Sequence, residues 1–190
     1  MNEKEYALDV IGAWIIVAGT LINASGETIN LIDNEEISYK LTGSGNAIEA
    51  AGNSLQAAGR SANPENKVSV FGSWLQAAGN SANAVSRLLI LNGQLEEGLY
   101  IDVIGNTVQT LGATAEAFEA SGEKQRIYRE QLTAGYLLIA GGAAVDGASG
   151  IYFLNRMTQK GKALAWFGGY LQAVGALLAA DAITCEGPNE

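Results

Sequence analysis

Residues 72–79 read GSWLQAAG, and in this segment two glycines, Gly72 and Gly79, stand seven residues apart around a mostly apolar run. Seven residues make about two turns of an α-helix, so both glycines lie on one helix face and leave a groove without side chains there. The repeated spacing predicts helices that pack against one another through glycine. The other copies are Gly12 to Gly19, Gly45 to Gly52, Gly52 to Gly59, Gly105 to Gly112, Gly135 to Gly142 and Gly168 to Gly175.

The glycines carry a cost that the fold must offset. A glycine inside a helix costs about 0.5–1 kcal/mol relative to alanine, and a dozen cost on the order of 6–12 kcal/mol. That sum is comparable with the net stability of a domain. Close approach between helices is the compensation that the sequence suggests. We therefore predict thirteen helix-packing glycines: Gly12, Gly19, Gly45, Gly52, Gly59, Gly72, Gly79, Gly105, Gly112, Gly135, Gly142, Gly168 and Gly175.

Break signals divide the chain into six segments. They are Ser25-Gly26, Asn63-Pro64, Asn92-Gly93, Ser121-Gly122 and Gly161, and each falls between two glycine motifs. No segment shows the alternation typical of strands. The sequence predicts an all-α, six-helix repeat bundle in a single domain, 1–190. The expected helices are 3–24, 35–62, 65–91, 95–120, 124–156 and 161–183.

The repeat unit has two interpretations. Gly12, Gly72 and Gly135 stand 60 and 63 residues apart, which favours three αα-hairpins. The segment DVIG occurs at 9–12 and again at 102–105, which favours two three-helix halves. Either unit is a duplication that cannot bury its own face alone.

The faces of the helices differ between two groups. The second, third and fourth helices each carry a polar stripe, which in the third is Ser73, Gln76, Asn80, Asn83 and Arg87. We expect these stripes to face water. The first, fifth and sixth helices are apolar nearly all round, so they must be central or meet an apolar partner. The candidate partner face is Ile16, Tyr136, Ile139, Ala165 and Ala176.

The composition argues against nucleic-acid binding and against catalysis. The net charge of −9 disfavours nucleic acid as a partner. The chain has no histidine, and no glycine-rich loop or carboxylate pair has the spacing of an active site. We therefore expect no enzyme activity, no catalytic residues, no cofactor and no metal. The lone thiol, Cys185, fits a reducing, cytoplasmic compartment. Asp146, in an apolar helix, is a candidate buried contact or site.

The longest uncharged runs are 163–180, 68–86 and 10–26. A membrane-spanning helix needs about 20 mainly apolar residues. The run 68–86 carries serine, asparagine and glutamine on one face, so we do not expect it to span. Membrane association through the first, fifth and sixth helices is the alternative to a cytoplasmic protein.

Repeated glycine–alanine helices with the G-x6-G spacing, in a small acidic chain without histidine, resemble an uncharacterised repetitive protein family of Bacillus-type spore-forming bacteria. The resemblance covers most of the chain and implies neither an activity nor any site residue. Our leading interpretation is a non-enzymatic structural or protein-interaction module that associates with itself or with another protein. A membrane-associated helical protein is the alternative.

Overall fold

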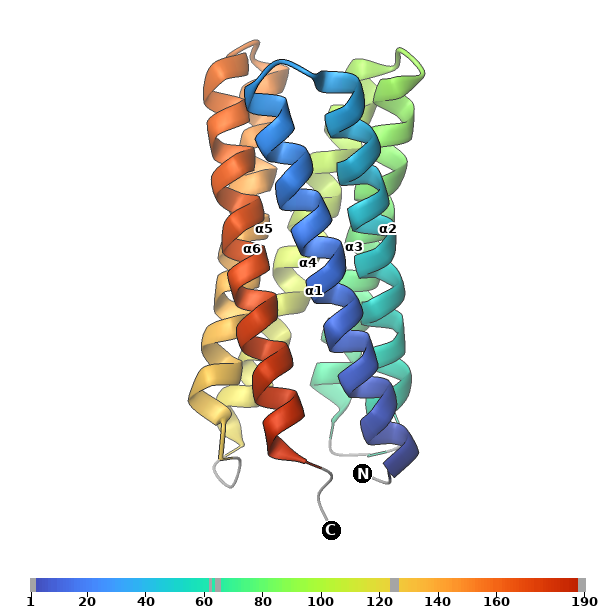
Figure 1. Ribbon diagram of the computed structural model, residues 1–190, viewed down its shortest axis with the longest axis vertical. Coiled ribbons are helices and arrows are strands. Elements are labelled where there is room, and N and C mark those ends of the chain that lie inside the picture. Colours follow the sequence, from blue (N-terminus) through green and yellow to red (C-terminus); the bar gives the residue numbers. More distant parts are fainter. Residues whose placement is uncertain (1–2, 62, 64–65, 124–126, 188–190) are drawn as a thin grey trace.

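The computed structural model describes residues 3–61, 63, 66–123 and 127–187. These residues form six helices and no strand, which confirms the predicted all-α, six-helix bundle. The helices run up and down along the long axis, and both termini lie at the same end (Figure 1). Their bounds are α1 (Glu3–Leu31), α2 (Glu35–Arg60), α3 (Lys67–Leu91), α4 (Leu95–Gly122), α5 (Arg129–Leu154) and α6 (Thr158–Glu186).

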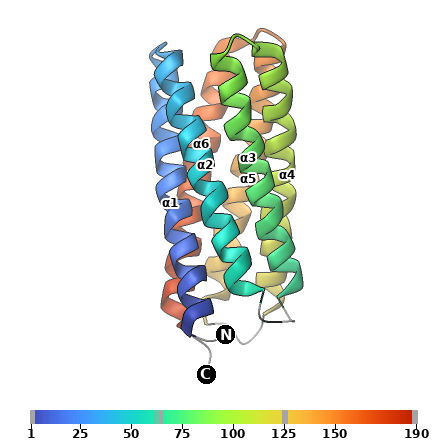
Figure 2. The same ribbon diagram turned by 90° about the vertical axis from the view of Figure 1, so that its right-hand side faces the viewer.

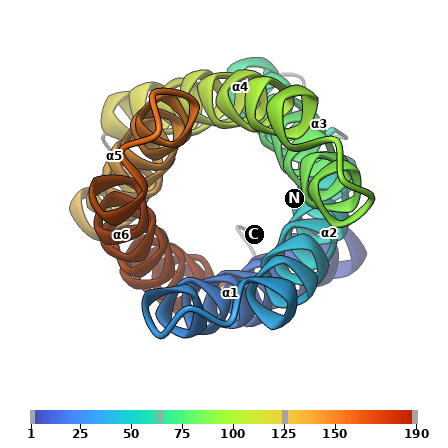
Figure 3. The ribbon, with the colours of Figure 1, turned by 90° about the horizontal axis from the view of Figure 1, so that it is seen from above.

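The helices form a closed ring. Each helix contacts the helices before and after it in sequence, and α6 closes the ring against α1. Seen along the long axis, the six helices surround a common centre that none of them occupies (Figure 3). The side view shows the same helices side by side and roughly parallel to the long axis (Figure 2). Every helix therefore has two faces on its neighbours, one face inward and one face outward.

Glycines meet in reciprocal pairs where the two helices of a hairpin cross. An ideal Cβ built on each of these glycines would lie 2.5–2.8 Å from the carbonyl oxygen of its partner. Real side chains essentially never approach so closely, so glycine alone fits. The pairs are Gly12 with Gly52, Gly19 with Gly45, Gly72 with Gly112, Gly79 with Gly105, Gly135 with Gly175 and Gly142 with Gly168. Each hairpin has two such crossings at matching positions, so the αα-hairpin is the structural repeat. The thirteenth glycine, Gly59, lies against the Glu5 carbonyl of α1.

The three hairpin turns also match. Each has a residue with positive φ after the end of its first helix: Asp33 (60°), Gly93 (84°) and Arg156 (59°). In each turn the next amide donates back to a carbonyl five residues earlier, as from Gln94 to Leu89 at 2.9 Å. This is the Schellman pattern that ends many helices. Only one of the three turns uses glycine, which is why the sequence signals the turn at 92–93 most clearly.

Two predicted breaks are helix interior instead. α1 runs to Leu31, because Gly26 lies against Thr42 and the Ser38 carbonyl of α2 rather than in a turn. α6 begins at Thr158, since Gly161 packs against the ring of Phe153. Both glycines serve close packing. Residues 62, 65 and 124–126, which the prediction placed in helices, lie outside the described residues.

The expectation that the polar stripes face water is wrong. Ser73, Gln76, Asn80 and Asn83 of α3 are only 0–3% exposed and face the centre of the ring. The apolar stripe of the same helix faces outward instead, with Phe71 61% exposed. The polar stripes of α2 and α4 are buried in the same way. No helix occupies the centre of the ring, so side chains must fill it. In α2, α3 and α4 the side chains that fill the centre are those of the polar stripe.

The predicted partner face is also wrong. Ile16, Tyr136, Ile139, Ala165 and Ala176 are all buried, at 2–8% exposure. Four of them belong to the apolar cluster inside the ring, because α1, α5 and α6 turn inward the helix face that carries these residues. These inward faces of α1, α5 and α6 lie across the centre from the polar stripes of α2, α3 and α4. The five residues are therefore core, and none of them offers a surface to a partner.

Candidate functional site

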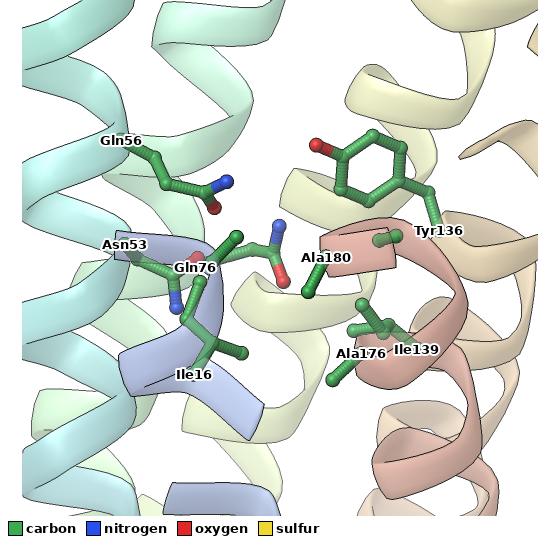
Figure 4. A pocket seen from close by; sticks show the side chains of 10 residues that line it. Ile16, Asn53, Gln56, Gln76, Tyr136, Ile139, Ala176 and Ala180 are labelled. Atoms are coloured by element: carbon green, nitrogen blue, oxygen red, sulfur yellow. The ribbon is translucent and has the colours of Figure 1, made fainter. Parts of the chain in front are cut away.

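The inside of the ring is packed. The chain exposes 8999 Å² to solvent, close to the roughly 8,600 Å² expected of a compact monomer of this mass. A cavity of about 10 Å³, about the space that one water molecule needs, lies near the middle. Asn53, Gln56 and Gln76 line one side of it, and Ile139 and Ala176 line the other (Figure 4). Around this cavity the interior is therefore polar on one side and apolar on the other.

Charged side chains gather in this interior. Six acidic residues point inward from four helices, together with two arginines. They form two groups, one near the end that holds the termini and one toward the end that holds the three hairpin turns. The acidic residues are Asp9, Glu27, Glu49, Asp102, Glu116 and Asp146, and the arginines are Arg60 and Arg87.

The first group, which we call the Arg60 cluster, comprises Asp9, Gln56, Arg60, Ser73, Gln76, Glu116 and Tyr136. Arg60 donates from Nε to Asp9 at 2.9 Å and from Nη2 to the Tyr136 hydroxyl at 2.7 Å, and it forms an ion pair with Glu116. Glu116 also accepts hydrogen bonds from Ser73 and Gln76. One guanidinium therefore ties side chains from five helices together, and each carboxylate has a cationic partner.

The second group, the Arg87 cluster, comprises Glu27, Glu49, Arg87, Asp102 and Asp146. Arg87 Nη2 lies 3.1 Å from Asp102 Oδ1 and 3.9 Å from Glu27 Oε1. Asp146 is within electrostatic range of all four other members. Its Oδ2 atom accepts a 2.6 Å hydrogen bond from Gln172 of α6. Four carboxyl groups thus share one guanidinium.

Several polar atoms near the Arg87 cluster have no hydrogen-bond partner among the described residues. They include Glu49 Oε1, Asn83 Oδ1, Asp146 Oδ1 and both amide atoms of Asn80. Glu49 and Asn80 are 1% and 0% exposed. A buried polar atom without a partner costs about 1–3 kcal/mol, so such atoms in native proteins usually bind water or a ligand. In the Arg60 cluster, by contrast, no fully buried side-chain oxygen lacks a partner.

The outside of the ring is uncharged along most of its height. Within 7–31, 41–59, 68–91, 98–118, 131–154 and 163–180, none of the exposed side chains is charged. These bands are 18–25 residues long and carry large exposed side chains such as Phe118 (74%) and Ile104 (60%). Exposed charges lie beyond the bands. One example is Lys40, whose hydrogen bond to Glu36 lowers the pKa of that carboxyl.

Three helices are long and apolar enough by composition to cross a membrane: α1, α5 and α6. These are the helices that the sequence singled out. In α2, α3 and α4, the buried polar stripe lowers the average hydropathy, although their outward faces are as free of charge as the others. Hydropathy averaged over a whole helix misses this difference between faces.

Sequence reasoning found part of this site. Asp146 was a candidate, and it belongs to the Arg87 cluster. The other interior charges were assigned to water or left unremarked. Their signal was a few charges, such as Glu49 or Asp102, on helix stripes that otherwise carry small or amide side chains. Among the described residues, no group of three Asp, Glu or Cys side chains is placed to hold a metal ion. Cys185 is exposed beside Asp181.

A search of curated proteins and a search of solved structures both gave no match. One family model matches residues 7–180, which include every glycine crossing and both interior clusters. Its family has no known activity from which a role for these residues follows. The chain belongs to this family, the family of unknown function DUF6944.

Proposed function

We propose that the protein is an integral membrane protein whose six helices all span the bilayer around a polar interior. The observation that carries the proposal is the uncharged outer band on every helix, combined with charges that lie inside the ring or at its ends. In a water-soluble protein we would expect the reverse, with charged side chains on the outside and apolar side chains inside. A soluble monomer rarely exposes a contiguous apolar patch larger than a few hundred Å².

The dimensions of the band suit a bilayer. At 1.5 Å per residue, helical bands of 18–25 residues are about 27–38 Å long, and the hydrocarbon core is about 30 Å thick. The helices satisfy their own backbone hydrogen bonds, as lipid requires. The helices stand side by side, so the six bands lie next to one another around the ring (Figures 1 and 2).

The interior also suits a membrane protein. Ionisable residues within membrane helices face the bundle interior and pair with one another, as Arg60 does with Asp9 and Glu116. Helices in lipid gain little from hydrophobic burial against each other, so small residues at their crossings supply the contact. The reciprocal pairs, such as Gly79 with Gly105, are crossings of this kind.

The role that follows is non-enzymatic: a compact bundle that keeps an acidic, polar interior within the membrane. A second candidate is self-association, in which further copies of the chain cover the apolar bands in water. The exposed apolar bands favour both membrane insertion and self-association. A bilayer would cover the outer faces of all six helices at once, whereas one dimer contact would cover only some of them. No cofactor and no nucleic acid enters either proposal.

Fractionation after expression separates the two candidates. For a spanning protein, we expect the chain in the membrane pellet, retained through an alkaline carbonate wash and released by detergent. A chain that stays in the supernatant without detergent, as a particle larger than 19.8 kDa, would instead support self-association.

A further inference from the structure

We infer that Glu49 is a proton-binding site near mid-height of the bundle, where its carboxyl group carries a proton in the folded protein at neutral pH. The inference deepens the proposed membrane role, on which it rests for the lipid around the ring. Acidic side chains buried within membrane helices commonly serve as proton relays. Three features of Glu49 carry the inference: its position, the absence of a cationic partner and its incomplete hydrogen bonding.

Glu49 lies inside the ring and far from both of its ends. It is one residue from the middle of the uncharged band 41–59 of α2, and it is only 1% exposed. Its Cγ atom packs against Gly19 of α1, where an ideal Cβ would come within 2.6 Å of it. The side chain is therefore held at a glycine crossing between α1 and α2. A carboxylate at such a place loses its hydration, which strongly disfavours the ionised form.

Glu49 has no cationic partner among the described residues. Arg87, the arginine of the same cluster, lies 3.1 Å from Asp102 and 3.9 Å from Glu27. Asp146 of α5 is within electrostatic range of Glu49, and a negative charge there opposes a second one on Glu49. The charged groups that surround Glu49 are thus acids and an arginine that is already paired. A proton on Glu49 removes its share of the repulsion.

The hydrogen bonds of Glu49 do not suit a full negative charge. Asn23 of α1 bonds to its carboxyl group, and Oε1 has no partner. A buried carboxylate that stays ionised accepts several hydrogen bonds or forms an ion pair. A protonated carboxyl group needs fewer donors around it, because one of its oxygens becomes a donor itself.

Glu116 of α4 is the matched residue that should stay ionised. It is also a glutamate inside the ring, and it has the same 1% exposure. Glu116 forms an ion pair with Arg60 and accepts hydrogen bonds from Ser73 and Gln76. Burial alone therefore does not distinguish the two glutamates. The guanidinium and the additional donors do.

The first test records infrared spectra of the purified full-length protein at neutral pH. A maltoside detergent is used because it has no carbonyl group to interfere. Protonated carboxyl groups absorb at a frequency separate from that of ionised ones. We expect a protonated-carboxyl band in the wild type, part of which shifts when only glutamate carboxyl groups carry carbon-13. Glu49→Gln should lose this glutamate part, and Glu116→Gln should retain it.

The second test measures how unfolding depends on pH. In the unfolded chain Glu49 is in water and releases its proton at neutral pH, so the folded state holds one proton more. Stability then falls as the pH rises, and the unfolding equilibrium constant increases about tenfold per pH unit for that proton. Glu49→Gln should reduce the dependence by this factor. Glu116→Gln should not reduce it, because Glu116 is ionised in both states.

Three infrared results would overturn the inference. They are a wild type without a protonated glutamate band, a band that persists unchanged in Glu49→Gln, and an equal loss in Glu116→Gln. The labelled wild type decides the first outcome even if a variant fails to fold. The fractionation test is independent, because a protein that is soluble without detergent can be measured in the same way.

Discussion

A single methyl group at a glycine crossing should weaken the bundle. In Gly79→Ala the new Cβ would lie 2.5 Å from the Gly105 carbonyl oxygen and 2.8 Å from the Gln109 amide nitrogen. Both are backbone atoms of α4, so α3 and α4 must separate until the shorter distance reaches at least 3.0 Å. The second crossing of the same hairpin, Gly72 with Gly112, is equally tight and prevents a simple tilt.

Two opposing terms set the size of the effect. Overpacking costs about 1–3 kcal/mol, and two backbone contacts place this site at the upper end. Replacing glycine in a helix returns about 1 kcal/mol. We expect a net loss of about 2 kcal/mol, or a melting temperature lower by about 4–8 °C.

The matched control is Gly141→Ala in α5, whose new Cβ would have no atom within 4 Å. It keeps the helix-propensity gain without the clash, so its melting temperature should rise by about 2–4 °C. Tryptophan fluorescence during heating in one detergent measures both variants. If Gly79→Ala melts at or above the wild-type temperature, close helix approach is not what the glycines provide.

Three further changes test the clusters and the membrane arrangement. Leu111→Lys places a charge near the middle of the outer band of α4, which costs about 2.5–3.5 kcal/mol in a membrane. The variant should therefore be depleted from the membrane fraction. A soluble protein would instead tolerate the change within about 0.5 kcal/mol. Arg60→Met leaves two buried carboxylates without their cation and should cost about 3–5 kcal/mol, so an unchanged melting temperature would contradict the role of the Arg60 cluster. A membrane-impermeant maleimide should label Cys185 from one side of a vesicle. In a cysteine-free background, it should label Lys4→Cys from that same side and Gln94→Cys from the opposite side. Labelling of all three positions from one side would refute six spans.

The helices and their contacts were predictable because they depend on local spacing. The seven-residue interval alone places both glycines of a pair on one helix face, whatever surrounds the helix. Helix ends were less predictable, because a glycine can mark a turn or a close contact between helices. Gly26 and Gly161 are packing positions, and the turns at Asp33 and Arg156 adopt positive φ without glycine.

The direction of the faces could not be read from periodicity. A repeat defines three stripes on each helix, but which one faces the centre depends on the medium outside. Assuming water outside assigned Gln76 and Asn80 to the surface and Tyr136 to a partner face, and all three are interior. One signal pointed the other way: only 16% of residues are charged, against about a quarter in typical soluble domains.

The arrangement of faces on α3 is the most direct test of the membrane proposal, because hydropathy alone does not mark this helix as a span. Single cysteines placed in turn along 71–88, in a Cys185→Ser background, carry spin labels in protein reconstituted into lipid vesicles. Collision rates are measured with oxygen, which concentrates in lipid, and with a water-soluble nickel complex. We predict that oxygen accessibility peaks at 71, 74, 78, 81, 85 and 88, the outward stripe, with little access for the nickel complex. Peaks of nickel access at these positions would place the stripe in water and contradict the proposal.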